Sequence, residues 1–116
     1  MIRLSLALAV LVAACTFVSV VTPKSGPASV GSSAPYTVYV GCGLRQSLFD
    51  LDGSLWVPIG VSNEDFTKTP SGFVGPDDAG TLSLVAPDKA EYRSSQGRVI
   101  ELVRHAGNLE IPSGCG

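Results

Sequence analysis

The chain has 116 residues, a formal net charge of −2 and 45% hydrophobic side chains. This length allows at most one small domain. From residue 35 onward, ten acidic side chains stand against six basic ones, a balance of about −4 with no basic cluster, which argues against a nucleic-acid partner.

The first 21 residues are the most hydrophobic part of the chain. Arg3 gives a short positive start, and the apolar stretch "LSLALAVLV" follows it. The next residues, "AAC", end at Cys15. Small residues directly before a cysteine resemble a bacterial lipobox, in which the thiol receives a diacylglycerol and the chain is cut just before it. We therefore expect a signal peptide over residues 1–14 and lipidation at Cys15.

Two alternatives remain for this segment. The run from Leu4 to Val21 holds 18 uncharged residues, which as a helix would measure about 27 Å and could span a bilayer core. An uncleaved signal anchor over residues 4–21 is therefore one alternative, and ordinary cleavage with secretion is the other. All three interpretations place the domain outside the cytoplasm, with Arg3 on the inner side.

Residues 22–35 are rich in residues typical of linkers. This segment, "TPKSGPASVGSSAP", has four Ser, three Pro and two Gly among its fourteen residues. Such a composition predicts a flexible tether with a reach of about 20 Å. We therefore expect anchor and linker over residues 15–35 and a β-domain over residues 36–116.

The three cysteines favour one disulfide. If Cys15 is lipidated or embedded in a membrane, Cys42 and Cys115 remain as a pair near the two ends of the domain. A bond between them would close a loop of about 73 residues, worth about 4 kcal/mol in the chain-entropy model. With one His and no Cys-x-x-Cys, the chain offers no common zinc site. We expect a disulfide, no metal and no cofactor.

The first half of the domain predicts a strand and a hairpin. Residues 36–42, "YTVYVGC", alternate with a period of two, which puts Tyr36, Val38, Val40 and Cys42 on the core face. Residues 46–57, "QSLFDLDGSLWV", form two apolar runs around Asp52-Gly53, a pair favoured in type I′ turns. This hairpin would place Trp56 in the core.

The second half predicts a long loop and three strands. Residues 58–80 contain seven Pro or Gly, which indicates a loop, and strands are expected over residues 81–86, 90–94 and 98–105. Residues 106–116 read as an irregular tail. The expected fold is all-β, a small antiparallel sandwich or partly open barrel of about five or six strands, preceded by an N-terminal apolar helix and a linker.

The long loop carries the candidate binding residues Phe66, Phe73, Asp77 and Asp78. Exposed, the two phenylalanines could anchor a partner; alternatively they fold back and cap one end of the barrel. The two aspartates read as a solvated turn. Asp50-x-Asp52 resembles part of a calcium loop, but hairpin chemistry explains it better.

No catalytic constellation stands out in this sequence. There is no Gly-x-Ser-x-Gly motif, and His105 reads as a surface residue at a strand end. We expect a membrane-tethered module of the cell envelope that binds an envelope protein or glycan. The alternatives are a small hydrolase using Asp77 or Asp78 with His105, and a structural or regulatory subunit without a ligand.

Several short motifs together are similar to a group of small exported actinobacterial proteins. They are "CGL" after a strand, "LFDLDGSLW", "PSGFVGPDDAGTLSL", "AEYRSSQGR" and the closing "PSGCG", spread over residues 36–116. The resemblance implies export, a Cys42–Cys115 bond and a core position for Trp56, and it implies no activity. The chain has Phe73 where that pattern leads us to expect Trp.

Overall fold

The computed structural model describes residues 18–112 and 115. The signal peptide, the alternative anchor helix and Cys15 lie outside the described residues, except that residues 18–21 of that anchor form a strand. The strands are β1 Val18–Val21, β2 Ser33–Tyr39, β3 Phe49–Leu51, β4 Ser54–Ile59, β5 Asp77–Ala86, β6 Lys89–Arg93, β7 Val99–His105 and β8 Leu109–Pro112, and the two short helices are η1 Leu44–Gln46 and α1 Asn63–Thr67.

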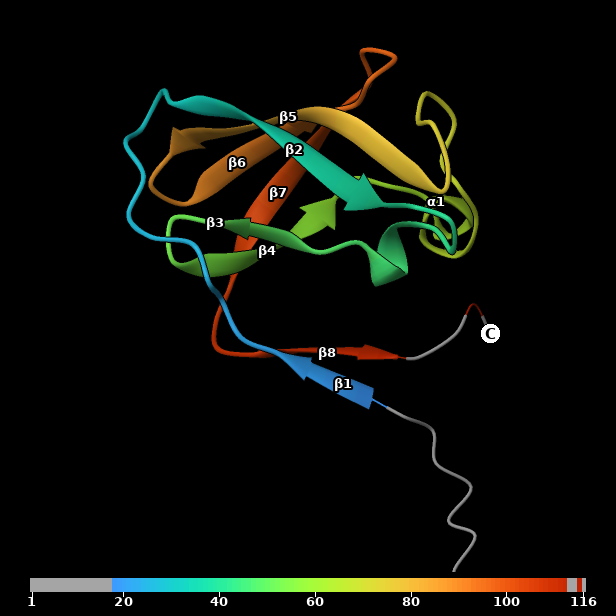
Figure 1. The fold of residues 1–116 in the computed structure, drawn as a ribbon, viewed down its shortest axis with the longest axis horizontal. Helices are drawn as coiled ribbons and strands as arrows, with labels where there is room; N and C mark the ends of the chain where they lie inside the picture. Colours follow the sequence, from blue (N-terminus) through green and yellow to red (C-terminus); the bar gives the residue numbers. More distant parts are fainter. Residues whose placement is uncertain (1–17, 113–114, 116) are drawn as a thin grey trace, which may run out of the picture.

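Six antiparallel strands form a nearly closed barrel. Their order is β2-β5-β6-β7-β4-β3, so that β2 and β3 are the two edges (Figure 1). The side chain of Tyr36 links these edges: its hydroxyl donates to Leu48 O at 2.7 Å and accepts from Asp50 N at 3.1 Å. The all-β prediction with a partly open barrel is confirmed.

The barrel core agrees with the sequence pattern. Val38, Val40 and Cys42 are buried and Tyr36 is half-buried, as the alternation over residues 36–42 predicts. Trp56 is 1% exposed, so its predicted core position is confirmed. The other large buried side chains are Phe49, Leu44, Leu55, Leu82, Leu84, Tyr92, Ile100 and Leu102.

The hairpin between β3 and β4 has the predicted turn. Asp52 and Gly53 have φ angles of 53° and 67°, and positive values at both positions are what a type I′ turn requires. The turn fixes the register, which pairs Leu51 with Ser54 and Phe49 with Trp56.

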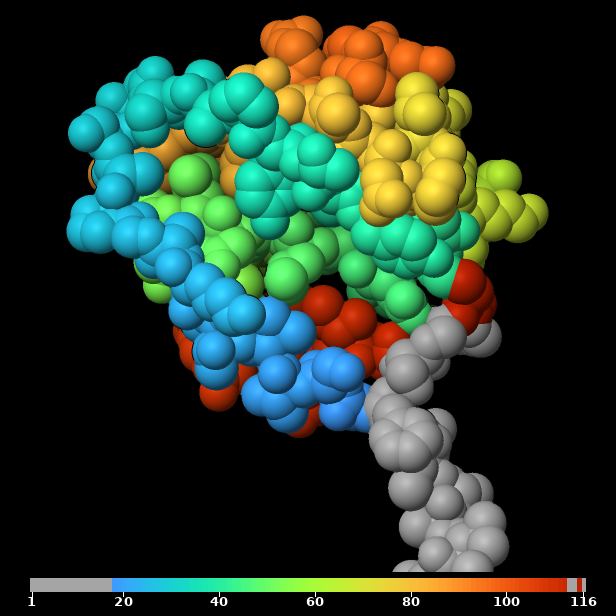
Figure 2. All heavy atoms as spheres, in the orientation of Figure 1, coloured from blue at the N-terminus to red at the C-terminus, as the bar shows by residue number. Residues whose placement is uncertain are grey.

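The segment before the barrel differs from the expected tether. Residues 18–21 form β1, which pairs with β8 in a separate two-stranded sheet, here called the ribbon. Residues 22–32, here called the strap, run from β1 along the β3–β4 hairpin to β2, which begins at Ser33 and not at residue 36 (Figure 1). Figure 2 shows the strap on the outside of the molecule and atoms of β8 between β1 and the barrel.

The C-terminal tail is also more regular than predicted. Residues 109–112 form β8, since Leu109 pairs with Val21 and Pro112 with Val18. The predicted disulfide is confirmed: Cys42 and Cys115 are bonded across 73 residues of sequence, with their Cα atoms 4.9 Å apart. This bond ties the end of the ribbon to the turn before η1.

The long loop is shorter than predicted. Strand β4 continues to Ile59 and β5 begins at Asp77, so the irregular part lies between them and contains α1. Ser62 caps α1 by accepting from Asp65 N, while the Asp65 carboxylate accepts from Ser62 N. This capping box explains why a helix of five residues forms in a segment dense in Pro and Gly.

Candidate functional site

An apolar hollow lies between the barrel, α1 and the ribbon. Its volume is about 360 Å³, which falls within the range of pockets that take small ligands. Most of the side chains around it are apolar, and the wall comes from four elements, η1, β4, α1 and β8. The lining residues are Leu44, Arg45, Ser47, Trp56, Val57, Pro58, Phe66, Leu109 and Glu110.

One wall of the apolar hollow depends on Gly43. A Cβ at this position would lie 2.5 Å from the backbone carbonyl of Phe66 and 2.7 Å from Lys68 N, and its φ is +84°. A residue with a side chain would therefore push α1 away from η1 and adopt a strained conformation. The glycine of the "CGL" motif thus sets the position of Phe66.

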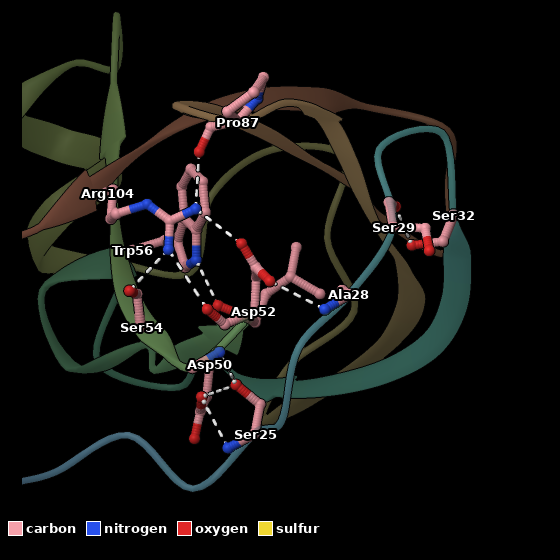
Figure 3. A network of polar contacts seen from close by, with 12 residues as sticks. Ser25, Ala28, Ser29, Ser32, Asp50, Asp52, Ser54, Trp56, Pro87 and Arg104 are labelled. Atoms are coloured by element: carbon pink, nitrogen blue, oxygen red, sulfur yellow. Dashed lines mark hydrogen bonds and ion pairs between the residues drawn. The ribbon is translucent and has the colours of Figure 1, made fainter.

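Another wall is held by Trp56. Its indole N–H donates to Leu51 O at 2.8 Å, and the guanidinium carbon of Arg104 stands 4.6 Å from the ring centroid. Arg104 is fixed in turn by Ser54 Oγ at 2.7 Å and by the Asp52 carboxylate at 2.8 Å (Figure 3). The indole is therefore fixed by polar contacts at its N–H and on its face.

The Asp50 and Asp52 carboxylates of the β3–β4 hairpin hold the strap. Asp50 accepts from Lys24 N at 2.7 Å and Ser25 N at 3.2 Å, and Asp52 accepts from Ala28 N at 2.8 Å (Figure 3). The Ala28 N–H and then Arg104 keep the pKa of the Asp52 carboxyl below its usual value. These contacts agree with the interpretation of Asp50 and Asp52 as residues of a hairpin turn and not of a calcium loop.

A second, polar hollow is lined mostly by residues of the same loop. Its volume is about 390 Å³, and Ser62, Glu64, Asp65, Thr69, Pro70, Ser71 and Arg98 line it. Arg98 binds both carboxylate oxygens of Asp65, at 3.2 and 2.8 Å. The hydrogen bond from Arg98 lowers the pKa of the Asp65 carboxyl. Arg98 and Asp65 satisfy each other, so this hollow offers a ligand hydroxyl groups, backbone and the exposed carboxylate of Glu64.

Asp77 and Asp78 do not form the expected solvated turn. Asp77 is exposed, but Asp78 is completely buried. The Asp78 carboxylate accepts from Val74 N at 2.9 Å, Tyr92 Oη at 2.6 Å and Ser95 N at 3.1 Å, and also from Ser95 Oγ. Burial raises the pKa of Asp78, and these hydrogen bonds outweigh that effect, so the net pKa lies below its usual value.

The two phenylalanines of the loop have different surroundings. Phe73 is 7% exposed, and its ring lies 5.8 Å from that of Tyr92 and 5.9 Å from the Arg98 guanidinium carbon. Phe66 is half-buried, packs against the core cluster and lines the apolar hollow. Phe73 therefore caps the barrel, as one of the two interpretations proposed, and Phe66 alone faces a space that a ligand could enter.

The residues of the hydrolase alternative lie at opposite ends of the barrel. Across the sheet, Thr81, Arg93 and Val99 form one row. Asp77 and Asp78 precede Thr81 in β5, and His105 follows Val99 by six residues in β7. Because β5 and β7 run in the same direction, the aspartates and His105 lie on opposite sides of this row. His105 is roughly 20 Å from the row at the rise of a strand. His105 is at a strand end, as expected, and is half-buried next to Leu55.

Sequence reasoning missed the role of the ribbon. Leu109 and Glu110 line the apolar hollow from a strand that no sequence pattern indicates, because four residues are too few for a recognisable alternation. Within residues 18–112 and 115, no three His, Cys, Asp or Glu side chains gather as a metal site, and no helix is long and apolar enough to cross a membrane. Comparisons with family models, curated proteins and solved structures each found no match to this chain.

Proposed function

We propose that this chain is a lipid-anchored module of the cell envelope, and that it binds its ligand in the apolar hollow beside Phe66. The observation that carries the proposal is the hollow itself, about 360 Å³ in volume and lined by Phe66, Trp56 and Leu109. Loops held on a rigid scaffold commonly carry binding residues. The ligand chemistry that fits is an apolar group of an envelope component.

The position of β1 favours the lipid anchor over the uncleaved helix. Because Val18 begins a strand, the apolar run available to a membrane helix shrinks to the fourteen residues from Leu4 to Phe17. As a helix these would measure about 21 Å, short of a bilayer core of about 30 Å. A diacylglycerol on Cys15 needs no such length.

The disulfide supports an extracytoplasmic location. Bonds of this kind persist in oxidising compartments, and Cys42–Cys115 leaves Cys15 as the single remaining cysteine. The mass of the intact protein extracted from membranes tests the anchor. We expect cleavage before Cys15 and the added mass of a lipid, and a full-length unmodified mass would contradict the proposal.

Ligand binding is tested through the single tryptophan. Because Trp56 lines the apolar hollow, titration with the probe anilinonaphthalene sulfonate should change its fluorescence and saturate at one site. Phe66→Ala should weaken this binding about tenfold. Val85→Ala, at an exposed valine outside the hollow, is the matched control. Equal affinity in both variants would remove the hollow from the proposal.

The class of natural ligand is then found by competition. Peptidoglycan fragments and detergent-solubilised envelope proteins are added separately to the protein loaded with the probe. Displacement by one of them, lost in Phe66→Ala, identifies the class. Displacement by neither, with the probe bound normally, would favour a structural or regulatory subunit without a ligand of its own.

A further inference from the structure

One face of the ribbon carries two exposed valines. Val18 and Val20 of β1 are 48% and 62% exposed, and β1, "VSVV", contains no charged residue. The paired strand β8, "LEIP", adds one charge to the face of Val18 and Val20, because exposed Glu110 pairs directly with Val20 and directly opposite residues share a face. Monomeric soluble domains do expose single valines, so the position of these two decides whether they matter.

The two faces of the ribbon point in different directions. Val21 and Leu109 are paired and half-buried, and Leu109 lines the apolar hollow. Because side chains alternate along a strand, Val18 and Val20 lie on the face opposite to Val21. The exposure of Val18 and Val20, against the half-burial of Val21, Leu109 and Ile111, makes theirs the outer face of the ribbon. In Figure 1, β1 lies farther from the barrel than β8 does.

The chain has no slack between the anchor and this face. Cys15 precedes Val18 by three residues, a distance that an extended chain covers in about 10 Å. Beyond β1, the strap cannot supply length, because Asp50 and Asp52 hold the amides of Lys24 and Ala28. The residues that composition suggests as a tether are therefore held against the hairpin and do not serve as free length.

We infer that the ribbon face, Val18 and Val20, rests on the surface of the lipid bilayer in which the Cys15 lipid is inserted. This inference depends on the lipid anchor of the proposed function. It deepens that function, because it fixes the orientation of the barrel: the ribbon lies at the membrane and the turn at residues 95–97, remote from β1 in Figure 1, points outward. The apolar hollow, walled by β8, then opens near the lipid surface.

The test measures how close chosen positions come to lipid. Full-length lipidated protein with Val20→Trp is reconstituted into phosphatidylcholine vesicles in which part of the lipid carries bromine on its acyl chains, which quenches nearby tryptophan. Val99→Trp is the matched control, since Val99 is a 41% exposed valine beside the outward turn. Unsubstituted protein gives the background from buried Trp56, and Val18→Trp repeats the measurement should Val20→Trp fold poorly.

We expect the added tryptophan at residue 20 to lose more than about half of its emission, and the one at residue 99 to lose little. Equal quenching at both positions, or none at either in protein that floats with the vesicles, overturns the inference and leaves the anchor intact. Emission at residue 20 that shifts with protein concentration but is not quenched shows a second copy on this face, which also overturns it. Protein that neither floats nor carries a lipid mass refutes the anchor itself.

Discussion

The strap and the long loop between β4 and β5 are alike in composition and are held in different ways. Both are rich in Pro, Gly and Ser. The strap is held from outside the barrel, by Asp50 and Asp52 of a neighbouring hairpin. The loop is held from within, because Asp78 is completely buried and Phe73 lies in the core. Composition therefore predicts the absence of regular structure, but not whether a segment is attached.

The largest effect should come from the Cys42–Cys115 bond, whose two ends lie next to neighbours of these regions. Cys42 adjoins Gly43, which contacts α1 of the loop, and Cys115 follows the strand that pairs with β1. Replacing both cysteines with serine should cost about 4 kcal/mol of unfolding free energy, measured by urea denaturation. Treating native protein with a reductant should give a similar loss. An unchanged midpoint in both experiments would show that the ribbon holds without the bond.

Asp78 should matter next, and by a different mechanism. Asp78→Ala removes an acceptor shared by Val74, Tyr92 and Ser95, which should destabilise the fold by about 3 kcal/mol because these donors are left without a partner. Asp77→Ala, at the exposed neighbour, is the control and should change little. Similar losses in the two variants would mean that the buried network does not hold the loop.

The same carboxylate should make stability depend on pH. The pKa of Asp78 is lowered on folding, so its stabilisation is fully present above the usual value of 3.8 and is lost as the pH falls through the lower value in the folded protein. The difference in unfolding free energy between native protein and Asp78→Asn should therefore shrink below about pH 3.8. Denaturation series at several acidic pH values measure it, and a difference that grows on acidification would contradict the assignment.

Gly43 should show a smaller effect, of about 2 kcal/mol. Gly43→Ala places a Cβ against the backbone of Phe66 and at a positive φ, and both effects destabilise. Gly97→Ala is a matched control, because Gly97 has a similar φ of +87° and no atom within 4 Å of its Cβ position. The excess loss of stability in Gly43→Ala measures the close approach of α1. Equal losses of stability in the two variants would mean that backbone strain alone, and not contact with α1, explains the effect of Gly43→Ala.

The smallest global effect should come from the strap. Ser25→Ala with Asp50→Asn weakens contacts made at the surface of the hairpin, so the unfolding free energy should change by less than about 0.5 kcal/mol. The amides of Lys24 and Ser25 should nevertheless exchange with solvent faster. Hydrogen exchange followed by mass spectrometry measures this local opening, and denaturation measures the global stability. A large global loss would place the strap with the loop as an integral part of the barrel.

The pattern of the barrel and the Cys42–Cys115 bond could be predicted from the sequence, but the burial of Asp78 and the pairing of β1 with β8 could not. Alternation over residues 36–42 and the Asp52-Gly53 pair predict a core face and a turn, because both are local properties of the chain. The burial of Asp78 depends on Ser95, 17 positions away, and the pairing of β1 with β8 joins residues 88 to 94 positions apart. No local signal marks such contacts.

In the candidate site too, local features could be predicted from the sequence and long-range contacts could not. Phe66 could be singled out because an aromatic residue in a loop rich in Pro and Gly is unusual. Its neighbours in the hollow, Trp56 and Leu109, come from distant strands, and the hollow exists only once these strands are assembled. Phe73, which the same reasoning singled out, is in the core because Tyr92 and Arg98 lie on either side of it.

The pairing of Val18 with Pro112 has a mechanical consequence. For a chain anchored at Cys15, any pull on the barrel by the surrounding envelope enters the fold at this pair. Hydrogen bonds between β1 and β8 carry the load first, and each is weak. Pro112 lies three residues before Cys115, whose covalent bond to Cys42 passes the load directly to the barrel. In a chain anchored at Cys15, the disulfide would therefore transmit to the barrel a force that reaches β8.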